Sequence, residues 1–187
     1  MTRWIASFLI AVAAASSALA EPRAWRIDPT QSALAIVYLI DGKEQRGAFS
    51  RFSGDALFDP DDLASAKLEF LIETGSIDAG EAFATEVVRG VDWLDVKAHP
   101  EARYVLTSLE PLGDGVYRAT GDLTLRGATG SVVGEMTLSV SGETATATGA
   151  ADFNRKDYRV GVGFTTLFVE VGDVIAVEFD LTAKPKE

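Results

Sequence analysis

The clearest strand pattern in this chain is Ala66-Lys67-Leu68-Glu69-Phe70-Leu71-Ile72-Glu73. Leu68, Phe70 and Ile72 share one face of an extended chain, and charged side chains take most of the other face. Side chains of a β-strand alternate between the two faces of its sheet. The stretch therefore predicts a strand whose apolar face lies on a core or on the wall of a cavity.

Similar runs recur on both sides of this stretch, with Gly, Asp or Asn between them. Gly113-Asp114-Gly115 and Ser141-Gly142 are typical hairpin turns, and Gly47 and Gly54 inside one long run predict bulges or bends where the sheet curls. The pattern predicts eight antiparallel strands, at residues 32–41, 44–58, 65–73, 102–110, 115–127, 130–141, 143–153 and 173–184.

One segment, at about 81–97, departs from the strand pattern. Apolar side chains recur there at spacings of three or four, which predicts one amphipathic helix or two short ones: Phe83, Val87, Val88, Val91 and Leu94. His99-Pro100 ends the segment, because proline disfavours helical geometry in the residue before it. The fold class expected is all-β, an eight-stranded antiparallel closed barrel or a curled sandwich with one inserted helical segment.

The composition excludes several kinds of chemistry. The 187 residues include 28 acidic and 17 basic side chains, one histidine and no cysteine, for a net charge of −11. Without cysteine there is no disulfide, thiol catalysis or cysteine-ligated metal, and the acidic balance argues against nucleic acid. His99, with Asp95 four residues before it, offers too few ligands for zinc and no favoured acid–base pair. We expect no catalytic residue, no metal site and no enzyme activity.

The first twenty residues predict a secretory signal peptide. Arg3 supplies a positive charge, Ile5 to Ala15 an apolar run, and Ala18-Leu19-Ala20 a small-x-small cleavage site. We expect cleavage after Ala20 and one exported domain over residues 21–187, because no linker or internal repeat interrupts that part of the sequence.

Small side chains in the predicted strand 143–153 favour a ligand cavity. By parity its inward residues are mostly small: Ala145, Ala147, Gly149, Ala151 and Phe153. A filled core normally uses larger residues, and an eight-stranded barrel has room for one small ligand. The alternative is that large neighbouring side chains fill the space, and composition does not decide between the two.

A loop after this strand concentrates positive charge in an acidic protein. Asn154-Arg155-Lys156-Asp157-Tyr158-Arg159 holds three cations in six residues. Guanidinium groups suit phosphate, so Arg155 and Arg159 are candidates for holding an anionic head group at a barrel mouth. Arg46 and Arg51 are second-rank candidates. The alternative is that these side chains pair with surface carboxylates or fix the loop.

Several short motifs follow one another in a characteristic order. They are Trp25-Arg26-Ile27-Asp28-Pro29 followed by Ser32, Gly47-Ala48-Phe49-Ser50-Arg51-Phe52-Ser53-Gly54, Gly75-Ser76-Ile77-Asp78-Ala79-Gly80, Trp93-Leu94-Asp95-Val96, His99-Pro100 before Tyr104, Gly121-Asp122-Leu123-Thr124-Leu125-Arg126-Gly127-Ala128-Thr129, and Asn154-Arg155-Lys156-Asp157-Tyr158. Their order and spacing resemble the YceI-like family of bacterial periplasmic, polyisoprenoid-binding proteins over essentially all of 24–184.

The resemblance implies a lipocalin-like barrel whose apolar interior takes an isoprenoid such as a polyprenyl phosphate or a ubiquinone. It implies no enzyme activity and no cofactor other than that bound lipid. It also makes a membrane protein of the cytochrome b561 type a conceivable partner. The sequence departs from the family at Ile40, where a histidine is common, and at Arg159, where glycine is usual.

The function expected is therefore a soluble periplasmic protein that binds an isoprenoid lipid and carries or sequesters it. By strand parity the expected wall residues are Leu34, Ile36, Tyr38, Leu68, Phe70, Ile72, Tyr117, Leu123, Met136, Leu138, Ala147, Gly149, Phe153 and Phe179. The second hypothesis is a non-enzymatic accessory protein of a membrane redox or stress system, acting through an exposed apolar patch along Phe83, Val87 and Val91. The oligomeric state is left open, a dimer included.

Overall fold

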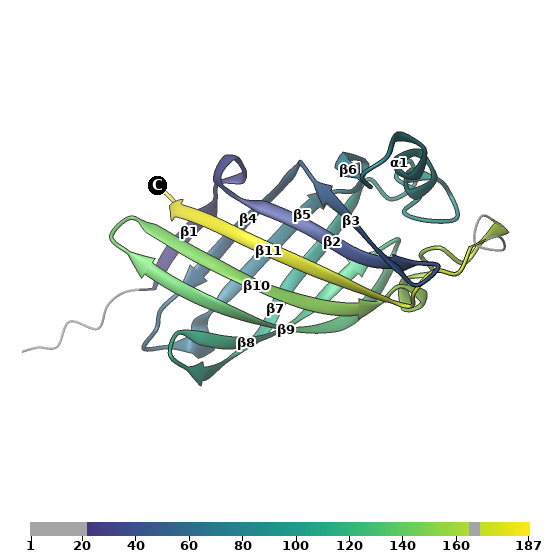
Figure 1. The fold of residues 1–187 in the computed structure, drawn as a ribbon. Helices are drawn as coiled ribbons and strands as arrows, with labels where there is room; N and C mark the ends of the chain where they lie inside the picture. The colour runs from purple at the N-terminus through teal and green to yellow at the C-terminus, as the bar shows by residue number, and fades with distance from the viewer. Residues whose placement is uncertain (1–21, 165–168) are drawn as a thin grey trace, which may run out of the picture.

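A computed structural model describes residues 22–164 and 169–187, and its strands curl into a barrel with α1 and β6 at one end (Figure 1). The predicted signal peptide, 1–20, lies outside the described residues. The strands are β1 (Arg23–Ile27), β2 (Ala33–Ile40), β3 (Lys43–Phe49), β4 (Phe52–Phe58), β5 (Lys67–Glu73), β6 (Ile77–Asp78), β7 (Glu101–Gly113), β8 (Val116–Leu125), β9 (Ala128–Ser141), β10 (Thr144–Asn154) and β11 (Val174–Pro185). The helices are α1 (Ala82–Arg89) and four short 3-10 turns, η1 (Pro29–Gln31), η2 (Leu63–Ser65), η3 (Thr74–Ser76) and η4 (Arg155–Tyr158).

Eight of these strands form a closed ring. The order is β1-β4-β5-β7-β8-β9-β10-β11, and β11 pairs back with β1. Every pairing is antiparallel. The predicted eight-stranded antiparallel barrel with an inserted helical segment is confirmed, and β2, β3 and β6 extend the sheet from β11.

The last strand, β11, has two partners along the same edge. Trp25 of β1 lies opposite Pro185, while Ala33 of β2 lies opposite Asp180. Between β1 and β2 the chain turns at η1, where the Asp28 carboxylate accepts hydrogen bonds from the backbone N–H and the hydroxyl of Thr30, at 3.0 and 2.6 Å. The five-residue β1, absent from the predicted strands, is therefore a true member of the ring.

The prediction of one strand over 44–58 is wrong, because β3 and β4 pair with different neighbours. β3 pairs with β2 and β6, and β4 with β1 and β5. At the break, the N–H of Arg51 donates to the Ser76 hydroxyl at 3.1 Å. Gly47 and Gly54 mark close approaches, since a Cβ would lie 2.8 Å from the Asp78 carbonyl oxygen in one case and 2.7 Å from Ile27 in the other. The strand pairings run through both glycines without a register shift, so neither is a bulge.

The inserted helix is shorter than the predicted 81–97. α1 ends at Arg89, and Gly90 after it is extended, with φ −68° and ψ 171°. The following residues form turns in which the N–H groups of Trp93 and Asp95 donate to the Gly90 carbonyl oxygen at 3.0 and 2.9 Å. Within the described residues, no helix has both the length and the apolar character needed to cross a membrane.

Two apolar clusters line the barrel interior. One includes Trp25, Phe52 and Phe70 in the ring of strands. The other includes Ile77 and Trp93 beneath the α1 end. The helical insertion thus covers one end of the barrel with buried side chains, and the strands enclose the rest.

Candidate functional site, an apolar cavity in the barrel

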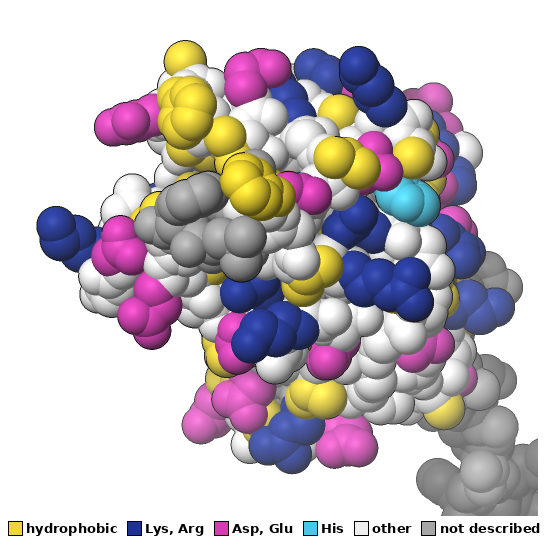
Figure 2. All heavy atoms as spheres, turned by 90° about the vertical axis from the view of Figure 1, so that its right-hand side faces the viewer, with side chains coloured by type: hydrophobic (Ala, Val, Ile, Leu, Met, Phe, Trp, Pro, Cys, Tyr) yellow, Lys and Arg dark blue, Asp and Glu magenta, His cyan; other side chains and the backbone are white. Residues whose placement is uncertain are grey.

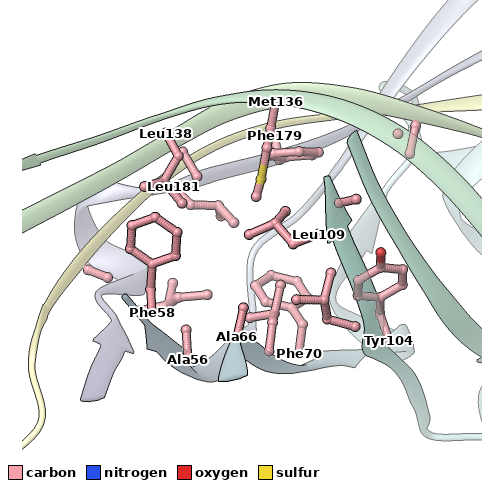
Figure 3. A pocket seen from close by; sticks show the side chains of 18 of the residues that line it. Ala56, Phe58, Ala66, Phe70, Tyr104, Leu109, Met136, Leu138, Phe179 and Leu181 are labelled. Atoms are coloured by element: carbon pink, nitrogen blue, oxygen red, sulfur yellow. The ribbon is translucent and has the colours of Figure 1, made fainter. Parts of the chain in front are cut away.

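An internal cavity of about 210 Å³ lies within the ring of strands (Figure 3). All eight ring strands contribute side chains to its wall, from Trp25 of β1 to Leu181 of β11. A single buried water needs only roughly 10–15 Å³, so this space is far larger than a packing defect. Its lining is predominantly apolar, as in sites for small lipophilic ligands.

Small residues on β10 create much of this space. Exposed and half-buried positions alternate along β10, as predicted, and the inward Ala145, Ala147 and Ala151 line the cavity. Ala147 lies opposite Leu138 on β9 and Leu181 on β11. Large side chains surround these alanines without closing the gap, so the interior is not filled by its neighbours.

The predicted wall residues gather around the interior. Ten of them line the larger cavity: Leu34, Leu68, Phe70, Ile72, Leu123, Met136, Leu138, Ala147, Phe153 and Phe179. Ile36 and Tyr38 line a second cavity, of about 90 Å³, beneath α1. Tyr117 and Gly149 line neither cavity. Contact of these residues with a ligand stays a prediction.

The two exceptions have local causes. The Tyr117 ring packs edge-on against Phe58, with ring centroids 6.0 Å apart and planes at 88°. Gly149 allows β9 and β10 to come close, because a Cβ there would lie 2.8 Å from the Cα of Met136. Phe58 itself, together with Tyr104 and Leu109, is among the wall residues that strand parity did not identify.

The two cavities adjoin along the barrel. They share the wall residues Leu34, Ile72, Leu123, Phe153 and Val177. The smaller cavity continues the apolar interior towards Trp93 and Leu94. The interior is therefore elongated, a shape suited to an extended chain.

Four polar side chains belong to the wall of the larger cavity, those of Trp25, Tyr104, Thr146 and Lys67, and the last two are exposed. Tyr104 of β7 lines it, and its hydroxyl oxygen, in red, stands out among the carbon side chains in Figure 3. Burial, helped by the charge of Asp122, raises the pKa of Tyr104 to about 12. Trp25 is 3% exposed, and its Nε1–H has no hydrogen-bond partner among the described residues.

Arg155 is not available to a head group. Its side chain is buried, and its guanidinium donates to the carbonyl oxygens of Gly172, Val160, Gly161 and Val171 at 2.6–3.1 Å. A further contact reaches the Asp173 carboxylate at 3.4 Å. All five N–H donors of the group are thereby used. The structure supports the alternative role, in which Arg155 fixes the loop after β10.

The other three head-group candidates lie on the outside of the barrel. Arg46 pairs with Glu178 at 2.5 Å, and Arg51 pairs with Glu73. Arg159 is exposed in the left-handed region, with φ 57°. None of the three lines either cavity. Contact of these residues with a head group at the barrel mouth stays a prediction.

Comparison with known proteins gives matches over most of the chain. A family model described as the YceI-like domain matches residues 25–183. A UPF0312 protein of Vibrio parahaemolyticus is 30% identical over 132 residues, which is 67% of this chain and 70% of that protein. A UPF0312 protein of Shewanella oneidensis is 32% identical over 137 residues, which is 69% of this chain and 72% of that protein.

Solved structures share the fold. BcnA of Burkholderia cenocepacia has a TM-score of 0.79 and 30% sequence identity, over 84% of this chain and 99% of that one. A polyisoprenoid binding domain from Saccharophagus degradans, implicated in plant cell wall breakdown, has a TM-score of 0.70 and 16% identity, over 88% and 99% of the two chains. With a family model matched from β1 to β11 and this barrel in common, the chain belongs to the YceI-like family.

Proposed function

We propose that this protein binds an isoprenoid lipid inside the barrel, with the chain in the larger cavity. The observation that carries the proposal is the closed ring of strands around an elongated apolar space. Burial of apolar surface yields about 0.8 kcal/mol per methylene group, so each five-carbon unit enclosed contributes a few kcal/mol before the costs of association. A prenyl chain needs no specific polar partner for this gain.

The relatives support this ligand class. The Saccharophagus degradans protein, which shares the fold, is described as a polyisoprenoid binding domain. Its low identity to this chain makes it a guide to the shape of the interior rather than to individual contacts. The alanines of β10 and the absence of charged side chains from the inner wall formed by β8, β9, β10 and β11 favour a hydrocarbon chain.

We further propose that binding serves carriage or protection of the lipid in the periplasm. The support is the sequence of Met1 to Ala20, with its positive start, apolar run and small-x-small site. A lipid that must leave a membrane needs a cover for its chain, and a barrel closed on itself supplies one without an exposed sheet edge at the ring. No reaction of the lipid is part of the proposal.

The test is to purify the mature protein from periplasm without detergent, extract it with organic solvent and analyse the extract by mass spectrometry. We expect a stoichiometric isoprenoid. An empty extract, together with no uptake of added quinones or polyprenyl phosphates, would contradict the proposal. Fractionation of cells in parallel, with a cytoplasmic and a periplasmic marker enzyme, tests the location separately.

One observation favours a second candidate function, that of a surface partner for a membrane system such as a cytochrome b561-type protein. Phe83 of α1 is 81% exposed and Val91 is 69% exposed, while Val87 packs inward on the core. Figure 2 shows apolar side chains among charged ones at this end of the molecule. Crosslinking in intact cells tests it. The wild type should form a specific crosslinked product with its partner, and the double variant Phe83→Ser, Val91→Ser should not.

A further inference from the structure

Two side chains in the wall of the larger cavity, Tyr104 and Trp25, can donate a hydrogen bond and have no partner among the described residues. Tyr104 Oη forms no hydrogen bond with any residue of the described ranges, and the cause of its raised pKa is burial followed by the charge of Asp122, with no hydrogen bond contributing. Trp25 Nε1 is likewise unpartnered in that part of the chain, and indole N–H can only donate. Buried polar groups are normally paired, so the Trp25 Nε1–H lacks a partner that a further molecule would supply. The half-buried Tyr104 hydroxyl is free to donate to such a molecule as well.

The Tyr104 ring is held in place by its surroundings. Tyr104 lies opposite Phe70 on β5 and Leu123 on β8. A Cβ at Gly121 of β8 would overlap the phenol end of the ring, so the ring lies against the backbone at that glycine. The hydroxyl group is thereby positioned at a fixed depth in the wall, and little side-chain entropy would be lost when it forms a hydrogen bond.

The same wall lacks what an anion needs. Among the described residues that line the larger cavity, the charged side chain is that of Lys67, which is exposed at the start of β5. The four arginines considered for a head group are outside the cavity or used by the loop after β10. A phosphate drawn into the buried part of this space, away from the exposed Lys67, would lose its hydration without a cation in return, which is strongly unfavourable.

We propose that the Tyr104 hydroxyl donates a hydrogen bond to an uncharged oxygen of the bound lipid, so that the cavity selects an isoprenoid with a carbonyl, ether or hydroxyl oxygen over a prenyl phosphate or a bare hydrocarbon. This inference rests on the proposed lipid-binding function. It assigns Tyr104 a role in orienting the ligand, because the phenol marks the depth at which the oxygen must lie.

The test compares three probes with the same fifteen-carbon chain: farnesyl-1,4-benzoquinone, farnesylbenzene and farnesyl phosphate. Dissociation constants are measured for the wild type, for Tyr104→Phe and for the control Tyr117→Phe, whose phenol lines neither cavity. One neutral hydrogen bond corresponds to about a two- to tenfold change in Kd. We expect Tyr104→Phe to weaken binding of the quinone by that factor and to leave binding of farnesylbenzene unchanged. Tyr117→Phe should change the binding of neither probe.

A spectroscopic readout separates a hydrogen bond from a change of packing. In the wild type the infrared carbonyl stretch of the bound quinone should shift to lower frequency, and in Tyr104→Phe the shift should be absent. Three results would overturn the inference while the lipid-binding function stands. Tyr104→Phe could weaken binding of the quinone and of farnesylbenzene equally, the carbonyl band could be the same in the wild type and the variant, or farnesyl phosphate could bind as tightly as the quinone. If no probe binds the wild type, the proposed function itself fails, and the inference fails with it.

Discussion

Met136 on β9 and Gly149 on β10 lie directly opposite each other, so close that a Cβ on Gly149 would lie 2.9 Å from the Cβ of Met136. The same Cβ would overlap the Glu135 carbonyl oxygen. We expect Gly149→Ala to lower the free energy of unfolding by about 1–3 kcal/mol, the usual cost of overpacking. Urea denaturation measures this. Gly75→Ala is the matched control, since a Cβ at Gly75 meets open space, and an equal loss there would contradict the explanation.

Filling the cavity should block the lipid without unfolding the barrel. Ala147→Phe places a ring in the space between Leu138 and Leu181, whereas Thr148→Phe places the same ring on the exposed face of β10. We expect the lipid recovered per protein to fall several-fold in Ala147→Phe and to stay at the wild-type level in Thr148→Phe. Mass spectrometry of the extracts measures it. Full occupancy of a folded Ala147→Phe would place the ligand elsewhere.

Arg155→Met should destabilise the fold rather than alter ligand binding. The substitution leaves buried carbonyl oxygens of Val160, Gly161 and Val171 without their donor, and each unsatisfied group costs about 1–3 kcal/mol. Thermal unfolding should show a large loss, and Arg155→Lys should restore little, because an ammonium group has three donors and no planar fork. The exposed Arg159→Met is the control. Normal stability with impaired lipid uptake in Arg155→Met would restore its head-group role.

The barrel should lose stability in acid. Hydrogen bonds to Arg51 and Lys186, together with the cationic charge of each partner, lower the pKa of Glu73 and Asp55 from ordinary values of 4.5 and 3.8. A group with a lowered folded-state pKa stabilises the fold above its ordinary pKa and loses that contribution as pH falls through the folded value, because the unfolded chain then binds more protons.

Urea midpoints should therefore be level above about pH 5 and fall below about pH 4. Asp55→Asn removes one of these carboxylates, and also its contacts with Arg26 and Lys186 at 3.2 and 2.7 Å. This variant should start from a lower stability at pH 7 and show a shallower decline in acid. A decline as steep as that of the wild type would assign the acid sensitivity to other carboxylates. Added salt should reduce the difference, since these pairs are exposed.

The alternation of side chains predicted most of the barrel because burial of one face acts on each strand separately. Ala147 and Phe153 of β10, and Met136 and Leu138 of β9, line the cavity as their parity requires. On β7 parity fails, since the register against β8 shifts between Leu106 and Ser108, and this turns Leu109 rather than Ser108 towards the interior. Such irregularities depend on the neighbouring strand and leave no mark in the pattern of one strand.

Partners distant in sequence account for the remaining differences. The break between β3 and β4 is fixed by Ser76, which accepts from the Arg51 N–H through its side chain. Whether Arg155 faces a ligand or a loop depends on carbonyl oxygens distant from it in sequence, such as that of Gly172. The sequence analysis did not place Tyr104 in the wall, and the missing hydrogen-bond partner of its hydroxyl is visible only in three dimensions.

The pairing of Trp25 with Pro185 sets the order in which this barrel can form. Its first and last strands complete the ring, and contacts between segments so far apart in the chain form slowly. Without β11 the ring is open between β1 and β10, and a chain truncated before Val174 would leave the edges of β1, β10 and β2 that faced β11 unpaired. The step that closes the ring is therefore the same step that encloses the apolar cavity within it.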